Sequence, residues 1–380
     1  MRLPQHRQEE KPFLHDKLRD LKSLLDGNKD SDPRGVGKTR VLPWLVLSAT
    51  LLSLFACVSF VSRRWDSDGE QYGKSDLHLD LTLRNLVSVS IGLSQLAGER
   101  IRKVKQSHKE GVEIKGQTNE GVDEPVTVAD KVSNSVFING FKSIFGNDMQ
   151  LVSEETQPKT EAIIPQLEFV DTFVGGDRIL NKQDISIIVD PLDATKEFTE
   201  ETDVDGSNML PFVTTLVCIV EKAQPIAGII YRPFASNEPV IWGIATPHAR
   251  HVYPNIAKIA TGDSAHLIAV SRSHTGDAKD IVRDVISDPS HSYRSLPVGG
   301  SGYKSWLVLT GQADAYIHVT KIKIWDLCAG HALLRAAGGD VTDKRGNPLL
   351  YKSDQPEFNN GLVAALHRNK IDAIVNKLSS

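Results

Sequence analysis

The chain of 380 residues has little cysteine and little net charge, and each shortage excludes a class of protein. Its three cysteines, Cys57, Cys218 and Cys328, are too few for a disulfide framework or a zinc constellation. Cys218 and Cys328 stand among apolar residues, and the sequence leaves open whether they are buried thiols or are bridged to each other. The net charge of −4 offers no basic surface for a nucleic acid, so no nucleic-acid partner is expected. No Asn-x-Ser/Thr sequon occurs, so glycosylation says nothing about membrane topology.

One uncharged apolar run stands out near the N-terminus. Residues 41–61 read VLPWLVLSATLLSLFACVSFV and would form a helix of roughly 31 Å, about one bilayer core. A cleaved signal peptide is the alternative, but its apolar region usually spans only about 7–15 residues and ends in small residues. We therefore expect an uncleaved signal anchor. Basic residues before the run outnumber those after it, which predicts a cytoplasmic N-terminus and a lumenal C-terminal part.

The rest of the chain divides around this anchor. Residues 1–40 are polar and predict a loose cytoplasmic tail, and residues 62–75 predict a juxtamembrane linker. From residue 76 to residue 380 strand and helix patterns interleave, which predicts a layered α/β or α+β catalytic unit with sub-domains of about 76–260 and 261–380. Strands are expected at residues 126–128, 151–153, 185–189, 212–220, 226–231, 267–270 and 315–319, and helices at 77–104, 131–145, 278–286, 303–309 and 325–337.

The most informative block follows the buried apolar strand at 185–189. There Asp190 and Asp193 flank Pro191, which is expected to end strand pairing and to hold both carboxylates on a rigid corner. Taken alone, such a turn is often no more than a helix cap, with Asp193 starting the next helix.

Further acidic residues stand in the same context, at an expected strand end or helix start. They are Asp130, which we expect to cap the helix at 131–145, Glu154 and Asp326. Together these carboxylates supply the hard oxygen ligands that magnesium prefers. Two ions about 3.5–4 Å apart can activate water for attack on a phosphate ester.

These motifs together resemble the inositol monophosphatase superfamily, a group of magnesium-dependent, lithium-sensitive phosphatases. The resemblance covers about residues 77–375 and is carried, in the expected order, by Val126-Thr127-Val128-Ala129-Asp130, Glu154-Glu155, Asp190-Pro191-Leu192-Asp193-Ala194-Thr195 and Trp325-Asp326-Leu327-Cys328-Ala329-Gly330. It implies an αβαβα sandwich of the inositol monophosphatase type, here preceded by one transmembrane helix.

Three further segments are similar to the bisphosphate nucleotidase branch of that superfamily. They are Lys196-Glu197-Phe198-Thr199-Glu200, Ser271-Arg272-Ser273-His274 and Gly299-Gly300-Ser301-Gly302-Tyr303-Lys304. This branch implies hydrolysis of adenosine 3′,5′-bisphosphate, the by-product of sulfotransferases, to AMP and phosphate. Combined with the anchor, it implies a single-pass type II protein of the Golgi membrane with a lumenal catalytic domain. Family members commonly form dimers, so a homodimer is a further expectation.

The resemblance also implies a role for each site residue. Two or three magnesium ions would be held by Glu154, Asp190, the main-chain carbonyl of Leu192, Asp193 and Asp326. Asp130 and Thr195 would orient and deprotonate the attacking water. The nucleotide would contact Ser271, His274, Gly300 and Lys304.

Two departures from the superfamily pattern bear on these expectations. Ala194 stands where many members have glycine, and residues 203–208 lengthen the chain beside the expected pocket rim. Two other functions stay open. The first is an inositol phosphate phosphatase of the same superfamily, whose metal motifs would be the same. The second is a membrane-tethered binding protein without catalysis, which would lack a ligand or a water-activating residue; none is missing here.

Overall fold

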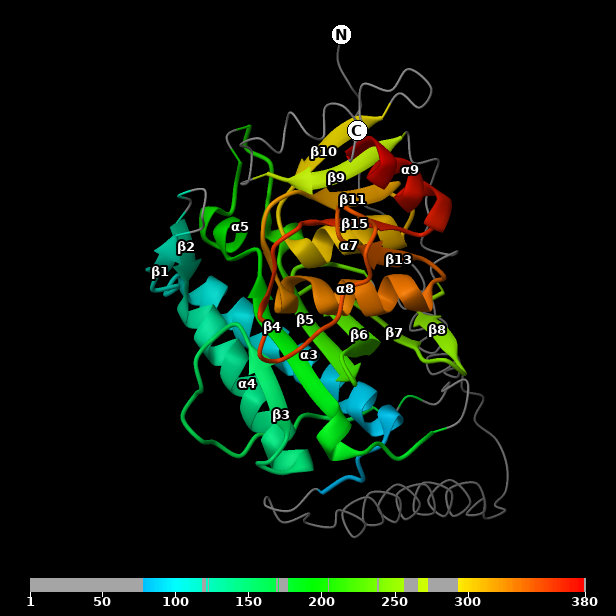
Figure 1. Cartoon of the computed structure of the whole chain (residues 1–380). Coiled ribbons are helices and arrows are strands. Elements are labelled where there is room, and N and C mark those ends of the chain that lie inside the picture. The colour runs from blue at the N-terminus through cyan, green and yellow to red at the C-terminus, as the bar shows by residue number, and fades with distance from the viewer. Residues whose placement is uncertain are drawn as a thin grey trace, which may run out of the picture. The chain divides into compact units, whose positions relative to one another are not determined.

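A computed structural model of the chain describes residues 78–117, 121, 123–168, 170, 177–203, 205–237, 239–255, 266–272 and 293–378 (Figure 1). The expected tail, the anchor at 41–61, the linker at 62–75 and the helix at 278–286 lie outside these residues. Within the described ranges, no helix has both the length and the apolar character needed to cross a bilayer. The anchor and the domain limits therefore stay predictions.

The six-stranded sheet is the larger of two main sheets. Its strands lie side by side in chain order: β3 (Gln150–Ser153), β4 (Ile185–Asp193), β5 (Thr214–Glu221), β6 (Gln224–Tyr231), β7 (Val240–Ala245) and β8 (Arg250–Tyr253). β3 pairs in parallel with β4, and every later neighbour is antiparallel. Both faces of the sheet are covered, so its central strands are nearly continuous runs of buried residues.

The second main sheet has the order β10-β9-β11-β15-β13. Its strands are β9 (Leu267–Ser271), β10 (Arg294–Val298), β11 (Ala315–His318), β13 (Asp340–Thr342) and β15 (Leu362–Ala365). β9 runs parallel to both β10 and β11, whereas β15 is antiparallel to β11 and β13. The strands are short, and the carboxyl ends of β9, β10 and β11 all reach the site described below.

Helices separate and flank the two sheets (Figure 1). They are α3 (Leu83–Ser107), α4 (Val128–Phe145), α5 (Thr195–Glu200), α7 (Ser301–Leu309), α8 (Ile324–Ala336) and α9 (Arg368–Leu378). One apolar core joins α3 and α4 to the outer face of the six-stranded sheet, and a second joins α7 and α8 to the inner faces of both sheets. A third core packs α9 on the outer face of the five-stranded sheet. The predicted layered α/β sandwich is confirmed.

Shorter elements complete the described chain. β1 (Glu113–Gln117) and β2 (Asp123–Val126) form an antiparallel hairpin, and β12 (Ile322–Lys323) pairs with β14 (Glu357–Phe358). Two 3₁₀ turns, η1 (Lys182–Asp184) and η2 (Leu210–Phe212), precede β4 and β5. Both two-stranded ribbons border the same cavity, which makes them part of its rim.

The start of α4 differs from the expectation. The expected strand at 126–128 ends at Val126, and the N-cap is Thr127 rather than Asp130. The Thr127 hydroxyl accepts hydrogen bonds from the amides of Ala129 and Asp130, while the Asp130 carboxylate accepts from the Thr127 amide. This reciprocal capping box places Asp130 inside the first helical turn, where its backbone is fixed.

Strand β4 also runs further than expected. Pairing with β5 continues past Pro191, because Asp190 opposes Leu216 and Asp193 opposes Thr214. Two residues of β4 therefore face one residue of β5 between these pairs, which is a β-bulge. The prediction that Pro191 ends the pairing was wrong: the bulge accommodates the proline, which has no amide to donate. As a result, both carboxylates belong to one strand.

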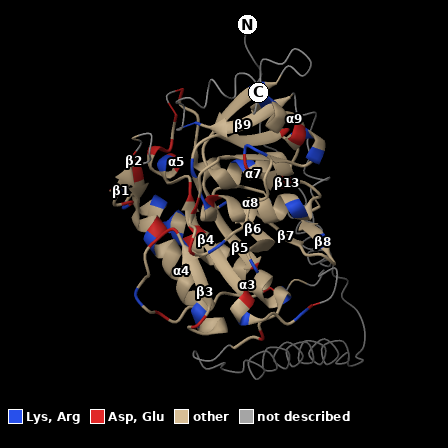
Figure 2. Ribbon diagram, viewed as in Figure 1, with Lys and Arg blue, Asp and Glu red and all other residues tan. Residues whose placement is uncertain are grey.

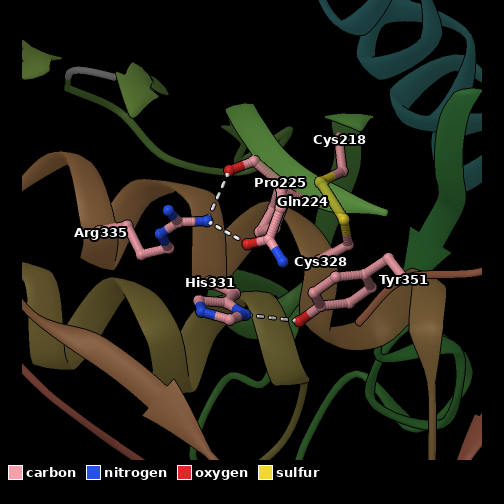
Figure 3. Close-up of a disulfide and its surroundings, with 7 residues drawn as sticks. All are labelled: Cys218, Gln224, Pro225, Cys328, His331, Arg335 and Tyr351. Carbon is pink, nitrogen blue, oxygen red and sulfur yellow. Dashed lines mark hydrogen bonds between the residues drawn. A yellow bond between two sulfur atoms is a disulfide. The ribbon is translucent and has the colours of Figure 1, made fainter. Parts of the chain in front are cut away.

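The two cysteines of the catalytic region are bridged. Cys218 on β5 and Cys328 on α8 form a disulfide with their Cα atoms 5.6 Å apart (Figure 3). The sequence left this pairing open. Because the two residues are 110 positions apart, the neighbourhood that allows the bond is created by the packing of α8 on the sheet.

Candidate active site

A cavity of about 340 Å³ opens where the ends of β4, β9, β10 and β11 meet α5 and the start of α7. Seven of the predicted site residues line it: Glu154, Asp193, Thr195, Ser271, Gly300, Lys304 and Asp326. Three more, Asp130, Asp190 and Leu192, are almost fully buried and touch or act on residues that line it. His274 lies outside the described residues. Figure 2 shows acidic and basic segments intermixed around α5 and the nearby end of β4.

Four acidic residues from three elements converge on this cavity. Glu154 follows β3, Asp190 and Asp193 lie on β4, and Asp326 lies in the first turn of α8. Burial raises the pKa of Asp190 well above its usual value, and the charges of Glu154, Asp193 and Asp326 raise it further. Burial likewise raises the pKa of Asp326, with added repulsion from Glu154 and Asp193. Packing thus crowds like charges together, an arrangement that a cation would stabilise.

The chemistry of these donors suits magnesium, since all four offer hard carboxylate oxygens. As the side chains stand, no three His, Cys, Asp or Glu residues in the described ranges are close enough together to hold an ion. Two of the acids already have close partners. The Lys115 ammonium lies 2.5 Å from Glu154 Oε1 and 2.6 Å from Glu155 Oε1, while Asp193 is bound by backbone amides. Metal binding would therefore require side chains to reorient around a fixed backbone.

Asp193 caps a helix, but not the one that follows it. Helix α5 starts after Ala194 without a side-chain cap. The Asp193 carboxylate instead accepts hydrogen bonds from the amides of Ser301 at 3.0 Å and Gly302 at 2.8 Å, at the start of α7. The Thr214 hydroxyl donates a third, at 2.8 Å. The alternative that Asp193 merely starts the next helix was wrong, and the observed contacts aim its carboxylate across the cavity.

Gly300 permits this contact. Its φ is +68°, and a Cβ atom there would lie 2.9 Å from both Asp193 Oδ2 and the Phe212 carbonyl oxygen. A side chain would push α7 away from β4. Gly300 therefore has a structural reason to be glycine in addition to the nucleotide contact expected from the sequence.

The Asp130 and Thr195 side chains meet as predicted. The Thr195 hydroxyl lies 3.1 Å from Asp130 Oδ1 and 3.0 Å from the Leu192 carbonyl oxygen, so it can donate to either. The other Asp130 oxygen accepts from the Thr127 amide and hydroxyl, at 2.7 and 2.5 Å. Burial raises the pKa of Asp130 to about 6, although the bonds from Thr127 oppose the shift. A carboxylate with that pKa, fixed on one side and facing a hydroxyl on the other, is suited to accept a proton near neutral pH.

Lys304 presents a buried cation to the same cavity. Only 3 % of the residue is exposed, and its ammonium makes one long hydrogen bond, 3.4 Å, to the Val298 carbonyl oxygen. Burial lowers the pKa of Lys304, while the charges of Asp193, Glu197 and Asp326 oppose that shift. Because the ammonium has no close carboxylate partner in the described contacts, it can bind an anionic group of a ligand.

Sequence reasoning assigned no role to several other residues that line the cavity, among them Lys115, Glu197, Arg272 and His318. Arg272 contacts Glu197 at 3.4 Å and Glu200 at 2.7 Å, and so ties β9 to α5. The joint presence of the 196–200 and 271–274 motifs could have indicated this pairing. His318 Nδ1 lies 3.4 Å from the Ser271 hydroxyl, and no sequence pattern marks it.

A family model described as the inositol monophosphatase family matches residues 82–379. Inositol monophosphatase 3 of Xenopus laevis is 33% identical over 309 residues, covering 78% of this chain and 82% of its own. The Golgi-resident adenosine 3′,5′-bisphosphate 3′-phosphatase of Mus musculus is 30% identical over 308 residues, covering 78% and 81%. The superfamily resemblance seen in the motifs is thereby confirmed.

Solved structures agree on the fold. The extragenic suppressor protein suhB from Bartonella henselae superposes with a TM-score of 0.56 at 19% identity, covering 78% of this chain and 99% of its own. An inositol monophosphatase from Thermotoga maritima superposes with a TM-score of 0.53 at 19% identity, covering 78% and 98%. At these identities the likeness establishes the architecture alone.

Proposed function

Because the chain belongs to the inositol monophosphatase family, we propose that it is a magnesium-dependent phosphomonoesterase that hydrolyses adenosine 3′,5′-bisphosphate to AMP and phosphate. The observation that carries the proposal is the composition of one cavity. An acidic cluster suited to magnesium and the buried Lys304 ammonium line the same cavity. The acids would serve the phosphate that is cleaved, and Lys304 would bind the phosphate that stays.

The proposed chemistry begins at the Asp130–Thr195 pair. Magnesium, when bound by Glu154, Asp190, Asp193 and Asp326, would neutralise the phosphate oxygens and acidify water. The Thr195 hydroxyl would take a proton from the attacking water as it passes its own proton to Asp130 Oδ1. Asp130, held by Thr127 on its other oxygen, would take up that proton. The Leu192 carbonyl oxygen, 3.0 Å from the Thr195 hydroxyl, would be a further oxygen available to hold the ions. The departing 3′ oxygen of the nucleotide would take a proton from solvent water.

We also propose that the catalytic domain acts in an oxidising compartment. The Cys218–Cys328 disulfide supports this, since disulfides persist in the secretory pathway and are rare in the cytosol. The apolar run at 41–61 would anchor the domain in the membrane, and mammalian relatives are named Golgi-resident. Removal of adenosine 3′,5′-bisphosphate there would relieve product inhibition of sulfotransferases. A homodimer stays a prediction from the family.

Inositol monophosphate hydrolysis is the second candidate, and the identity to inositol monophosphatase 3 of Xenopus laevis favours it. A protein that binds without catalysis is disfavoured, since the acidic cluster and the Asp130–Thr195 pair are all present. One assay separates the three. The full-length chain, purified in detergent with magnesium chloride, is tested for phosphate release from adenosine 3′,5′-bisphosphate, AMP and inositol 1-phosphate.

We expect fast release from the bisphosphate, slow release from the two monophosphates, loss of activity with EDTA and inhibition by lithium. Fast release from inositol 1-phosphate with none from the bisphosphate would establish the second candidate instead. No release from any substrate, with the fold intact by circular dichroism, would indicate a binding protein.

A further inference from the structure

The Cys218–Cys328 disulfide links the two parts of the fold that carry the acidic cluster (Figure 3). Cys218 belongs to β5 of the six-stranded sheet, and Cys328 belongs to α8, which lies between the two sheets. Both residues are at most 1 % exposed. The bond is therefore an internal tie between two layers of the protein.

On the sheet, the disulfide lies next to β4, the strand that carries two of the acids. Cys218 pairs with Ile188 on β4, and Asp190 is two residues further along the same strand. Because alternate residues of a strand share a face, Ile188 and Asp190 face the same layer. Cys218 and Ile188 both belong to the core formed with α8, so the face shared by Ile188 and Asp190 is the one covered by α8.

On the helix, the disulfide lies close to a third acid. Asp326 is in the first turn of α8, and Cys328 is two residues on, about 3 Å along the helix axis and about 200° around it, so the disulfide fixes the helix turn that carries Asp326. The N-cap residue Lys323 makes no side-chain cap bond, and the Asp326 carboxylate accepts a hydrogen bond from the Lys323 backbone. The pairing of β12 with β14, and a bond from the Ile324 amide to the Pro356 carbonyl oxygen at 3.0 Å, hold this end of α8 from the other side.

The surface beneath α8 is smooth at this point. A Cβ atom at Gly228 on β6 would lie 2.3 Å from the Ala329 carbonyl oxygen and 3.0 Å from the Ala332 Cβ. Small residues let the helix approach the sheet closely but provide few interlocking side chains against sliding. A covalent bond one residue from Ala329 adds a restraint at this point to the one that Leu333 provides where it packs over Gly243.

We propose that the disulfide is a positioning element of the metal site, which keeps Asp326 within reach of Asp190 and Asp193. The inference rests on the proposed function, because it takes these acids to be magnesium ligands. Their like charges repel one another across the gap between β4 and α8, and the disulfide resists the resulting separation. Loss of the bond should therefore weaken metal binding more than it slows turnover at saturating magnesium.

The test compares the oxidised full-length chain with the same protein after reduction by a phosphine and with the double variant Cys218→Val, Cys328→Ala. Manganese is the probe, because free Mn²⁺ is counted directly by electron paramagnetic resonance. Mass spectrometry after alkylation verifies the thiol state, and circular dichroism verifies the fold. The matched control is Cys57→Ala, which removes the third cysteine and keeps the bridge.

We expect the apparent Kd for Mn²⁺ to rise about tenfold in the reduced protein and in the double variant, as for loss of a group that orients a metal ligand. The apparent KM for magnesium should rise in parallel, with kcat at saturating magnesium changed less than about twofold, since the ligands themselves remain. The Cys57→Ala protein should match the wild type.

Equal Mn²⁺ affinity in the oxidised and fully reduced proteins would overturn the inference and leave the proposed function intact. Unfolding of both the reduced protein and the double variant would also overturn it, because the bond would then hold the fold as a whole. Absence of Mn²⁺ binding and phosphatase activity in the oxidised wild type would instead refute the proposed function.

Discussion

The two main sheets contribute different parts of the candidate site. The six-stranded sheet carries two of the acids on a rigid support: all nine residues of β4 are buried, and Asp190 and Asp193 flank a bulge in that strand. The five-stranded sheet contributes shorter strands whose ends, Ser271, Val298 and His318, line the cavity. Reaction chemistry would thus centre on two neighbouring acids of one buried strand, joined by acids from adjacent elements, whereas ligand recognition would be assembled from residues far apart in sequence.

This comparison predicts the largest effects for changes to the acids, beginning with one on the six-stranded sheet. Asp190→Asn should lower turnover at least about 100-fold, the equivalent of about 3 kcal/mol, because it removes a charge central to the acidic cluster. The variant should fold normally, since the amide relieves repulsion with Glu154, Asp193 and Asp326. Phosphate release at saturating magnesium measures the effect. Glu113→Gln, which alters an exposed acid on the rim, is the control and should keep wild-type activity.

Asp130→Asn should reduce turnover by about 10²- to 10⁴-fold, the usual range for loss of a general base. The base must be ionised, so wild-type turnover should fall as the pH drops through about 6, the pKa of Asp130. The variant should lack this acidic limb. A pH–rate profile that keeps the limb in Asp130→Asn would assign it to another group.

Asp130 should affect stability in the opposite sense: lower pH reduces turnover but stabilises the folded wild type. The folded pKa of Asp130 is above its ordinary value, so protonation stabilises the folded wild type. That stabilisation is complete below the unfolded pKa, near 4, and is lost as the pH rises through about 6. Relative to Asp130→Asn, the free energy of unfolding of the wild type should therefore increase as the pH falls between these values. Urea unfolding at several pH values measures the difference.

A change to Lys304, proposed to bind the second phosphate, should have a smaller effect that is confined to the bisphosphate substrate. Lys304→Met should raise KM for adenosine 3′,5′-bisphosphate by about tenfold or more, because a charge-assisted hydrogen bond contributes roughly 1.5–3 kcal/mol. Hydrolysis of AMP or inositol 1-phosphate should change little if Lys304 binds the second phosphate. An equal loss on all three substrates would show that Lys304 acts on the acidic cluster instead.

The same division explains what could be predicted from the sequence. The strand at 185–189, the pair β5 and β6, and the helix that carries Asp326 follow from local apolar patterns, and the structure places them where expected. The acids converge because each lies at the end of a strand or in the first turn of a helix. Each acid could be recognised because it stands next to a strand or helix that the sequence predicts. Their roles as ligands stay predictions.

Other features depend on tertiary contacts that no local pattern encodes. The disulfide joins residues 110 positions apart, and Lys115 reaches Glu154 from the β1–β2 hairpin. Asp193 binds the start of α7, more than a hundred residues further on. The errors at Asp130 and Pro191 have a different origin, since each residue can play two local roles: a cap or a first-turn partner, a strand end or a bulge.

The smallest predicted effect concerns the backbone between Asp193 and Thr195. Ala194 has φ of 70° and ψ of 44°, a left-handed conformation that costs a non-glycine residue about 1–2 kcal/mol. Ala194→Gly should remove this cost but add unfolded-state entropy worth about 0.4–1 kcal/mol, for a net gain of up to about 1.6 kcal/mol in the free energy of unfolding. Ala223→Gly is the matched control, an alanine with φ of 64° in the β5–β6 turn, away from the cavity. The midpoint temperature of thermal unfolding should rise by a similar amount in both variants. If turnover falls in Ala194→Gly alone, the strained alanine helps to hold Thr195 against Asp130; if turnover is unchanged in both, the surrounding hydrogen bonds suffice to position the pair.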